Sequence, residues 1–277
     1  MKNSKSSEEL APPKPLLRWA GSKRKLIPTV KRLLNTEETD FYIEPFCGSA
    51  TLFFELKPKK AFLSDINIDL INFLRTVKYR PNALFNSVSK FVIEKDQYQK
   101  LRNTSPDSLP ATDRAARFLY LNRFCFNGLY RTNRQGQFNV PWGGNRKNGT
   151  LPSLESLRFY STCLKNAEIK AIDFFPAIEN NASKGSTIYL DPPYATSSKR
   201  TFSYSSGCFS VADLDRLSKV LELIDTRGAK FVCSYADLAE FEYIRKGWNS
   251  YSVSVQRNIA GFAGARKLAK EWVLTNF

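Results

Sequence analysis

The chain has 277 residues, which is enough for one large α/β domain or for a core domain with a smaller module. It carries 42 Lys and Arg against 26 Asp and Glu, a formal net charge of +16, and it contains no histidine. This basic excess favours a polyanionic partner, most often nucleic acid, and the lack of histidine excludes Ser-His-Asp and Cys-His catalysis.

Cysteine usage and apolar runs set further limits. The five cysteines are scattered and form no CxxC pair, so we expect no metal site and no disulfide framework, and a reducing cytosol as the compartment. No apolar run approaches the roughly 20 residues of a membrane span, which predicts no membrane partner. Residues 1–14 lack the apolar segment of a signal peptide, and we expect a disordered lead there.

The N-terminal part of the chain predicts the start of a parallel sheet. Residues 16–34 combine an extended segment, a Gly-Ser turn and a basic helix. FYIEP at 41–45 predicts a strand, the small-residue loop FCGSA follows, and TLFFELK at 51–57 predicts a helix. KKAFLSDIN at 59–67 predicts a second strand that ends in Asp65. This order of elements is typical of a βαβ unit.

Residues 76–159 have a different texture and indicate an inserted module. Two stretches, 78–102 and 112–126, have apolar residues at the three- and four-residue spacing of helices. The polar, basic stretch LYRTNRQGQFNVPWGGNRK suits a β-hairpin around Asn133–Gly136 with a Gly-rich exit.

The α/β alternation then resumes to the end of the chain. Strands are predicted at 168–175, 186–190, 230–235 and 271–277, and an amphipathic helix at 212–224. The fold class that we predict is one α/β sheet domain, residues 15–75 and 160–277, interrupted by the mostly helical module at 76–159.

Acidic residues end several of these strands. Glu44, Asp65 and Asp191 each follow an apolar strand, and Asp173 closes a fourth possible one. Ligands of open α/β sheets gather at the carboxyl ends of the strands. Because a buried carboxylate is costly without partners, such a cluster indicates a polar ligand or a set of hydrogen-bonded turns.

The loop FCGSAT with Asp65 is a candidate nucleoside site. Its single glycine, Gly48, falls short of GxGxxG and is weak evidence alone. Asp65 lies 17 positions later, close to the roughly 20 at which an acid accepts hydrogen bonds from ribose. The alternative is that Asp65 caps a helix formed by IDLINFL. The loop has no Walker-type lysine, which favours a ligand without phosphates, such as S-adenosylmethionine.

The stretch STIYLDPPYA predicts an acceptor site for an aromatic amino group. The amino group of adenine is a poor nucleophile because its lone pair is delocalised into the ring. A carboxylate oxygen of Asp191 and the carbonyl of Pro192, held by a fixed φ, could accept both N–H bonds and favour a tetrahedral nitrogen. Tyr194 offers a face for a base swung out of a duplex. The alternative is a strand-ending turn with a chance aspartate.

These segments together resemble the Dam-type DNA adenine-N6 methyltransferases of the alpha class, the D12 family. The order, with the cofactor loop first, DPPY late and a DNA-reading module between them, is that of this class. The matching segments are RWAGSKRKLIP, YIEPFCGSATLFFEL, LSDINIDLINF, FLYLNRFCFNGLYRTNRQGQFNVPWG and IYLDPPY.

The resemblance implies a Rossmann-like, S-adenosylmethionine-dependent methyltransferase sheet and a set of ligand contacts. The implied cofactor-binding residues are Trp19, Lys23, Glu44, Pro45, Phe46, Gly48, Asp65, Asp173, Phe174 and Asp191. The implied catalytic residues are Asp191, Pro192, Pro193 and Tyr194.

The module resembles the target-recognition domain of the family, which acts on double-stranded DNA. Phe126 and Asn127 match the place where an aromatic enters the base stack. Residues that match base-reading positions are Arg18, Leu129, Arg131 and Pro141, and we expect Arg123, Asn133 and Arg134 on phosphates. The alternative is a solvated basic hairpin, against which the lone aromatic Phe126 argues.

Finer properties follow from the same resemblance. NGLYR and FNVP favour GATC as the target, although alpha-class enzymes with similar hairpins read other sites. We expect a monomer in the prokaryotic cytosol, near the nucleoid, and the resemblance allows a companion restriction endonuclease as a functional partner.

Two departures from the family pattern raise a competing hypothesis. Ala50 stands where the family has a second glycine, and Gly21–Ser22 where it has Gly-Gly. A Cβ at a position with positive φ would strain the loop, so one alternative is a DNA-binding protein that has lost turnover. A separate hypothesis, independent of these departures, is a methyltransferase for RNA or a protein amide. Those families more often carry Asn in place of Asp191 and lack the NGLYR hairpin, so Asp191 and NGLYR argue against it.

Overall fold

The computed structural model describes residues 13–19, 26–34, 39–133, 135–144, 150–195, 209–258 and 266–277. Predictions that concern Lys23, Arg134 and the pair Gly21–Ser22 lie outside these residues. Within the described residues, no helix has the length and apolarity needed to cross a membrane.

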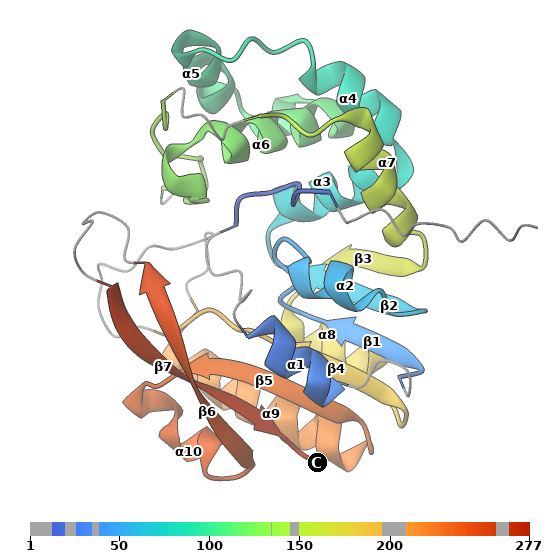
Figure 1. Cartoon of the computed structure of the whole chain (residues 1–277), viewed down its shortest axis with the longest axis vertical. Coiled ribbons are helices and arrows are strands. Elements are labelled where there is room, and N and C mark those ends of the chain that lie inside the picture. The colour runs from blue at the N-terminus through green and yellow to red at the C-terminus, as the bar shows by residue number, and fades with distance from the viewer. Residues whose placement is uncertain are drawn as a thin grey trace, which may run out of the picture.

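A seven-stranded sheet with strand order β3-β2-β1-β4-β5-β7-β6 forms the base of the molecule (Figure 1). The first five strands are mutually parallel, and β7 lies antiparallel between β5 and β6. The bounds are β1 Phe41–Glu44, β2 Ala61–Asp65, β3 Ala167–Ala171, β4 Ser186–Leu190, β5 Lys230–Ala236, β6 Asn249–Asn258 and β7 Arg266–Thr275. The strand order reverses between β1 and β4, and ligands of such sheets bind in the crevice at that reversal.

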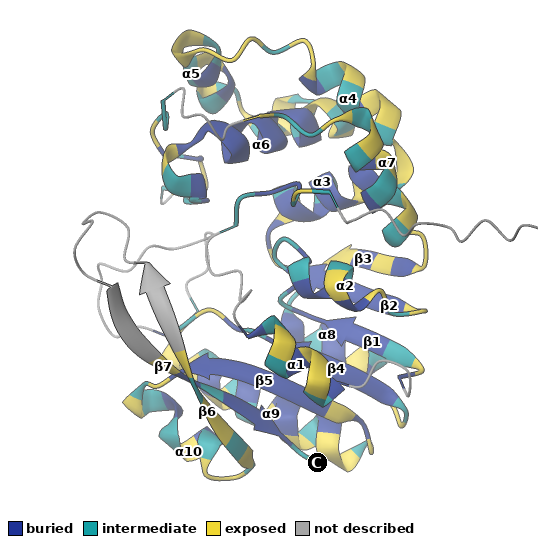
Figure 2. Cartoon of the chain, in the orientation of Figure 1, coloured by how far each residue is buried: buried dark blue, intermediate teal, exposed yellow. Residues whose placement is uncertain are grey.

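Both faces of the sheet are covered by helices. Helices α1 Ile27–Leu34, α2 Thr51–Leu56 and α3 Ile68–Tyr79 pack on one face, and α8 Phe174–Asn181, α9 Val211–Thr226 and α10 Glu242–Arg245 contribute to the core of the other. All five residues of β4 are buried, as expected for a parallel strand covered on both sides (Figure 2). The predicted α/β fold class is therefore confirmed.

A helical module, defined here as α4 to α7 with the connecting hairpin, extends from one end of the sheet (Figure 1). Its helices are α4 Pro81–Val88, α5 Lys95–Asn103, α6 Ala111–Phe124 and α7 Leu154–Cys163. Helix α6 is central, because its last ten residues, Ala115–Phe124, are all buried. The predicted hairpin is present as an antiparallel bridge between Thr132 and Phe138 around a turn at Asn133–Gly136.

One hydrophobic core joins the module to the sheet. It runs from Tyr42 and Leu63 in the strands through Phe73 of α3 to Phe118 of α6. The predicted boundaries at 76 and 159 fall inside α3 and α7, two helices that contact each other. A division of the chain into two separate domains therefore remains a prediction.

Two elements differ from the sequence prediction. The strand expected at 168–175 ends at Ala171, and Phe174 opens helix α8 with Asp173 as its N-cap. Strand β6 was not predicted, although its residues NSYSVSVQ alternate polar and apolar side chains.

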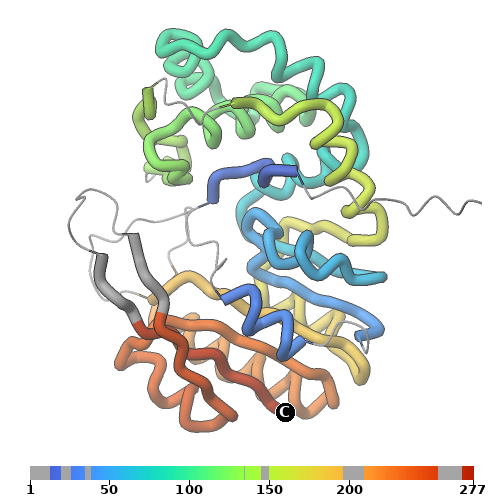
Figure 3. The backbone as a smooth tube through the Cα atoms, in the orientation of Figure 1, coloured from blue at the N-terminus to red at the C-terminus, as the bar shows by residue number. Residues whose placement is uncertain are grey.

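The N-terminal segment, residues 13–19, lies between the helical module and the sheet (Figure 3). Leu16 and Leu17 are buried in the shared core, and the Tyr160 hydroxyl donates to the Pro13 carbonyl at 2.8 Å. The segment thus contacts both parts of the molecule.

Candidate active site and nucleic-acid interface

The predicted strand-end acids meet at one edge of the sheet. Glu44 ends β1, Asp65 ends β2 and Asp191 follows β4. Side chains of a strand alternate between faces, and these acids share parity with Tyr42, Leu63 and Tyr189 of the core that contains α1 to α3. We call Glu44, Asp65 and Asp191 the acidic edge; it lies at the reversal of strand order.

Asp65 holds the loop that follows β1. Its Oδ2 accepts a hydrogen bond from the Gly48 amide at 3.1 Å, and its Oδ1 accepts one from the Asn67 amide at 2.9 Å. Burial raises the pKa of Asp65 to about 6 against these hydrogen bonds, which lower it. Helix α3 has a different cap, because Asn67 accepts from the Leu70 amide at 3.0 Å. Asp65 is therefore no helix cap, and its carboxylate fixes the position of Gly48.

Glu44 is the most deeply buried acid of this edge, at 4% exposure. The Tyr42 hydroxyl donates to its Oε2 at 2.9 Å. Burial raises the pKa of Glu44 to about 8, and the charge of Asp191 adds to this shift. The two carboxyl groups therefore interact across the gap between β1 and β4.

Trp19 of the N-terminal segment lies over the same loop. A Cβ at Gly48 would stand 2.9 Å from the Trp19 Nε1, and Gly48 has a φ of +48°. The indole stacks on Tyr130 with ring centroids 5.9 Å apart and lies 6.4 Å from the Phe118 ring. Only a glycine fits under this indole, so the loop and Trp19 form one surface.

An aromatic cluster lies on the other side of the sheet. The Phe46 and Phe174 rings stack with centroids 5.0 Å apart, and Phe209 lies 6.1 Å from each. Asp173 accepts from the Phe175 amide at 3.0 Å and forms an ion pair with Arg216, whose guanidinium lies 4.7 Å from the Phe174 ring centroid. The predicted cofactor residues Asp173 and Phe174 are thus adjacent, and the Asp173 carboxylate already caps α8 and pairs with Arg216.

The side chain of Asp191 is oriented by the neighbouring strand. The Ser234 hydroxyl of β5 donates to its Oδ1 at 3.1 Å. In the loop that follows, Pro192 is buried and Pro193 is exposed. Tyr194 donates from its hydroxyl to Glu271 Oε1 of β7 at 3.1 Å, and its ring meets the Tyr235 ring edge-on, with centroids 5.3 Å apart.

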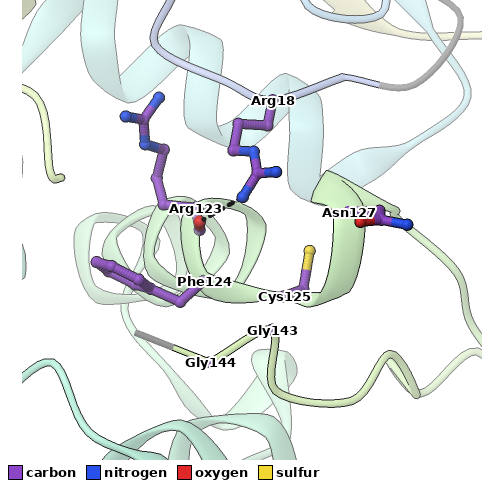
Figure 4. A pocket seen from close by; sticks show the side chains of 7 residues that line it. All are labelled: Arg18, Arg123, Phe124, Cys125, Asn127, Gly143 and Gly144. Atoms are coloured by element: carbon purple, nitrogen blue, oxygen red, sulfur yellow. Dashed lines mark hydrogen bonds between the residues drawn. The ribbon is translucent and has the colours of Figure 1, made fainter. Parts of the chain in front are cut away.

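The backbone of Arg18 is held by the central helix of the module. The Asn122 side chain accepts from the Arg18 amide and donates to the Arg18 carbonyl, both at 2.8 Å. The Arg18 guanidinium donates to the Arg123 carbonyl at 3.4 Å in a small pocket (Figure 4). The pocket is lined by Arg18, Arg123, Phe124, Cys125, Asn127, Gly143 and Gly144.

The turn after α6 presents an aromatic side chain to solvent. Phe126 is 38% exposed. Its amide donates to the Pro141 carbonyl at 2.9 Å, which joins the turn to the end of the hairpin. Asn127 and Gly128 follow with φ of 55° and 65°, and this left-handed pair turns the chain sharply. Phe126 is thus an exposed aromatic on a fixed backbone.

Comparison with known proteins gives this arrangement a family. The model of the D12 class N6 adenine-specific DNA methyltransferases matches residues 19–259. The chain belongs to this family. It is an adenine-specific DNA methyltransferase. This activity defines the family, and the names of its relatives agree with it.

The relatives cover nearly the whole methyltransferase. The Type II methyltransferase M1.LlaDCHI of Lactococcus lactis subsp. cremoris is 34% identical over 95% of each chain. The Type II methyltransferase M.MjaIII of Methanocaldococcus jannaschii is 34% identical over 89% of this chain and 92% of the relative. A DNA adenine methylase of Vibrio cholerae is 31% identical over 92% and 93%, respectively.

Several residues predicted to bind DNA have internal partners in this methyltransferase. Arg123 is 9% exposed and donates to the carbonyls of Thr150 at 2.9 Å and Pro15 at 3.2 Å, which ties the N-terminal segment to the module and fits a phosphate contact poorly. The Asn133 carboxamide accepts from the amides of Gln135 and Gln137 and so closes the hairpin turn.

The remaining predicted contacts lie on or beside the hairpin. Arg131 donates from Nε to the Asn139 side chain at 2.7 Å, which sets the direction of its guanidinium. Pro141 is exposed, whereas Leu129 packs against the core. The structure therefore brings Phe126, Arg131 and Pro141 to one part of the module.

Sequence reasoning missed four residues that contact or flank the predicted site residues. Ser234 and Glu271 act from strands β5 and β7 on the DPPY loop, and Asn122 holds Arg18. Their contacts join residues far apart in the chain, so no local pattern announces them. Ile66 could have been found: it follows Asp65 directly, and it is an apolar side chain left 49% exposed at the edge of the site.

Proposed function

We propose that this methyltransferase transfers the methyl group of S-adenosylmethionine to N6 of an adenine flipped out of duplex DNA, within the sequence GATC. The observation that carries the proposal is the juxtaposition of Asp191 with Glu44, Gly48 and Asp65 at the reversal of strand order.

The chemistry of the donor set fits S-adenosylmethionine. This cofactor supplies a methyl group activated by a positively charged sulfur. The buried carboxyl of Glu44 suits a positively charged ligand, and Asp65 suits ribose hydroxyls. Gly48 can lie against the Trp19 indole only because it has no Cβ. The indole thus forms one side of the proposed cofactor site. The exposed Ile66 offers apolar surface for a purine.

The target site needs two acceptors and a stacking surface. The Asp191 carboxylate, with one oxygen held by Ser234, suits one N–H of the adenine amino group. The Pro192 carbonyl suits the other, and Tyr194 stacks on the base. Drawing both protons toward acceptors returns the lone pair to the nitrogen that attacks the methyl group. The proton that the nitrogen then loses has carboxylates within the same edge to move toward.

Extrusion of the base needs a group to replace it in the stack. Phe126 is exposed, aromatic and fixed by the Pro141 carbonyl. Arg18 and Arg131 supply guanidinium groups for guanine edges, and each is oriented by a side chain or backbone of the module. These positions support a short site such as GATC.

A transfer assay tests the proposal. The full chain is incubated with S-adenosylmethionine carrying a labelled methyl group and with duplexes that contain GATC, a permuted site or GATC already methylated at N6. We expect label only in the unmethylated GATC duplex and N6-methyladenine as the product. Equal labelling of the permuted duplex would refute GATC, and label on cytosine would refute the acceptor site.

The proposal extends to the cellular setting. We propose a monomer that acts on chromosomal DNA in the prokaryotic cytosol, paired with a restriction endonuclease. Support for the endonuclease comes from the Type II designation of two relatives. Plasmid DNA from cells that express the chain should resist a GATC-cleaving enzyme that is blocked by adenine methylation.

A further inference from the structure

Two side chains of the DPPY loop need support that the loop cannot give. The prolines at 192 and 193 fix backbone angles, but they leave the side-chain torsions of Asp191 and Tyr194 undetermined. The described part of the loop, residues 191–195, contains no helix or strand. Whatever orients these two side chains must therefore come from other elements.

Strand β5 supplies the support for Asp191. Ser234 is fully buried, and its hydroxyl donates to Asp191 Oδ1 at 3.1 Å. The Tyr189 hydroxyl lies 3.0 Å from the Ser234 Oγ. Because serine has one O–H and directs it to the carboxylate, Tyr189 is the donor to Ser234. The result is a directed relay from Tyr189 through Ser234 to Asp191.

Burial keeps the proton of this relay in place. Tyr189 is 4% exposed. Burial, and next the charge of Asp191, raise the pKa of Tyr189 well above its ordinary value, so its hydroxyl stays a donor. A carboxylate with one oxygen held by such a chain keeps its plane and presents its acceptor in one direction.

Strand β7 supplies the support for Tyr194. Glu271 is 3% exposed and accepts from the Tyr194 hydroxyl at 3.1 Å. Tyr235 supports the ring from its edge, and the Tyr235 hydroxyl accepts from the Ala195 amide at 2.6 Å. Tyr235 itself stacks on Phe241 with centroids 4.2 Å apart. The Tyr194 ring is thus held at its hydroxyl, at its edge and through the next residue.

The two supports belong to one pair of strands. In the antiparallel pairing of β5 with β7, Ser234 is opposite Val273 and Ala236 is opposite Glu271. Opposite residues share a face, and so do residues two apart. Ser234 and Glu271 therefore point to the same side of the sheet, toward the DPPY loop.

We propose that Ser234 and Glu271 are positioning residues of the methyltransferase, Ser234 for the carboxylate that accepts from the target amino group and Glu271 for the ring that stacks on the target base. This inference rests on the proposed function, and it adds that the geometry of the acceptor site is set by β5 and β7 as well as by the prolines.

The Ser234 half is tested with Ser234→Ala and Tyr189→Phe. We expect the single-turnover rate of methyl transfer to fall about 10- to 100-fold in Ser234→Ala, the range for a hydrogen bond to a charged group. Tyr189→Phe should have a smaller effect, because Ser234 still donates to Asp191. Cofactor and duplex dissociation constants should stay within about twofold. Ser252→Ala, at an exposed residue of β6, is the matched control.

The Glu271 half is tested with a double-mutant cycle. Glu271→Leu and Tyr194→Phe each remove the hydrogen bond, so we expect similar losses and a double variant no worse than either. Glu271→Gln keeps an acceptor and should recover most of the rate, and it remains informative if Glu271→Leu does not fold. A duplex with 2-aminopurine at the target position should show weaker fluorescence enhancement with Glu271→Leu. Ser234→Ala should leave that enhancement unchanged. Glu222→Gln, exposed on α9, is the control.

The outcomes separate this inference from the proposed function. Wild-type chain that transfers no methyl group to duplex adenine would count against the proposed reaction. With an active wild type, normal rates in Ser234→Ala or strictly additive losses in the cycle would refute the positioning roles alone. A parallel loss of cofactor affinity and rate in either variant would assign that residue to the fold instead.

Discussion

The acidic edge and the helical module differ in what their side-chain hydrogen bonds hold in place and in which side chains they leave exposed. At the edge, each acidic side chain is held by a neighbour: Asp65 by two amides, Glu44 by Tyr42 and Asp191 by Ser234. In the module, Arg123 and Asn133 are used to hold the backbone together, whereas the aromatic Phe126 is left 38% exposed.

This difference fits the function that we propose for each region. Methyl transfer depends on acceptors that stand in place before the substrate arrives, because electrostatic stabilisation is strongest when no reorganisation is needed. Recognition of DNA needs side chains that can enter the double helix, and these must be exposed to solvent, as Phe126 is. Substitutions in either region test this difference.

The largest effect is expected from removal of Asp191, the proposed acceptor at the acidic edge. Asp191→Ala should lower the transfer rate by three orders of magnitude or more, by analogy with the loss of a main electrostatic group. Cofactor affinity, measured by calorimetry, should change little, because Asp65 and the Gly48 loop remain in place. Unchanged transfer in this variant would refute the assignment of the catalytic carboxylate.

A pH dependence of cofactor affinity should follow from Glu44. Its pKa of about 8 means that it is mostly protonated at pH 7 in the free protein. A positively charged cofactor favours the ionised form, so affinity should rise with pH by up to about tenfold per unit and level off above pH 8. Glu44→Gln should abolish this pH-dependent gain in affinity. The amino group of the cofactor also titrates, but it does so in the same way with both proteins and therefore cancels in the comparison. Below pH 6, protonation of Asp65 should weaken binding further.

Gly48→Ala tests the fit between the loop and Trp19. The added Cβ would meet the indole nitrogen at 2.9 Å at a residue with a φ of +48°. We expect cofactor affinity to fall about tenfold, the scale of 1–2 kcal/mol of strain. DNA affinity without cofactor should not change, and a weaker duplex complex would show that the loop also shapes the module.

Phe126→Ala tests the exposed side of the comparison. Loss of the aromatic should reduce base extrusion, read as 2-aminopurine fluorescence in the target position, and slow turnover about threefold to tenfold. Cofactor affinity should stay constant. Val92→Ala, another exposed apolar residue of the module at 58% exposure, is the control. Equal effects of both variants would remove the special role of Phe126.

The smallest effect is expected from Ala50→Gly. Ala50 has a φ of 53° and a ψ of 30°, which is the left-handed region where a Cβ is unfavourable. We expect the free energy of unfolding to rise by about 0.5–1 kcal/mol in denaturant titrations. Lys57→Gly, at a φ of 50° on the other end of α2, should give a similar gain. Destabilisation by Ala50→Gly would show that the alanine methyl group packs well enough to outweigh the strain.

Local patterns predicted the parts of this molecule that are encoded locally. The apolar strands that end in Glu44 and Asp65, and the one that Asp191 follows, were correctly located, because a buried strand with an acid at its end is visible in a few residues. The family pattern also marked position 50 as a place where a Cβ strains the loop if φ is positive, and φ at Ala50 is 53°. Asp173 was assigned to a strand end, whereas its side chain caps α8 and pairs with Arg216.

Long-range contacts could not be predicted in this way. The ion pair of Asp173 with Arg216 and the hydrogen bond of Tyr194 with Glu271 join residues 43 and 77 positions apart. Likewise, Arg123 is held by the carbonyls of Pro15 and Thr150, which are distant in the chain. The sequence shows only that Arg123 is basic, and this alone suggested a phosphate contact. Only packing of distant segments decides whether an arginine faces solvent or the interior.

The two-point clamp of Asn122 on Arg18 bears on attempts to build hybrid enzymes. Arg18 points toward the module, and its neighbour Trp19 lies against Gly48 in the loop after β1. Residues 13–19 therefore contact both the module and the sheet. A chimera that exchanges helices α4 to α7 for those of a relative should also import that relative's version of this short stretch. A chimera without that stretch would combine helix α6 of the relative with residues 13–19 of this chain. We expect it to lose both sequence specificity and turnover.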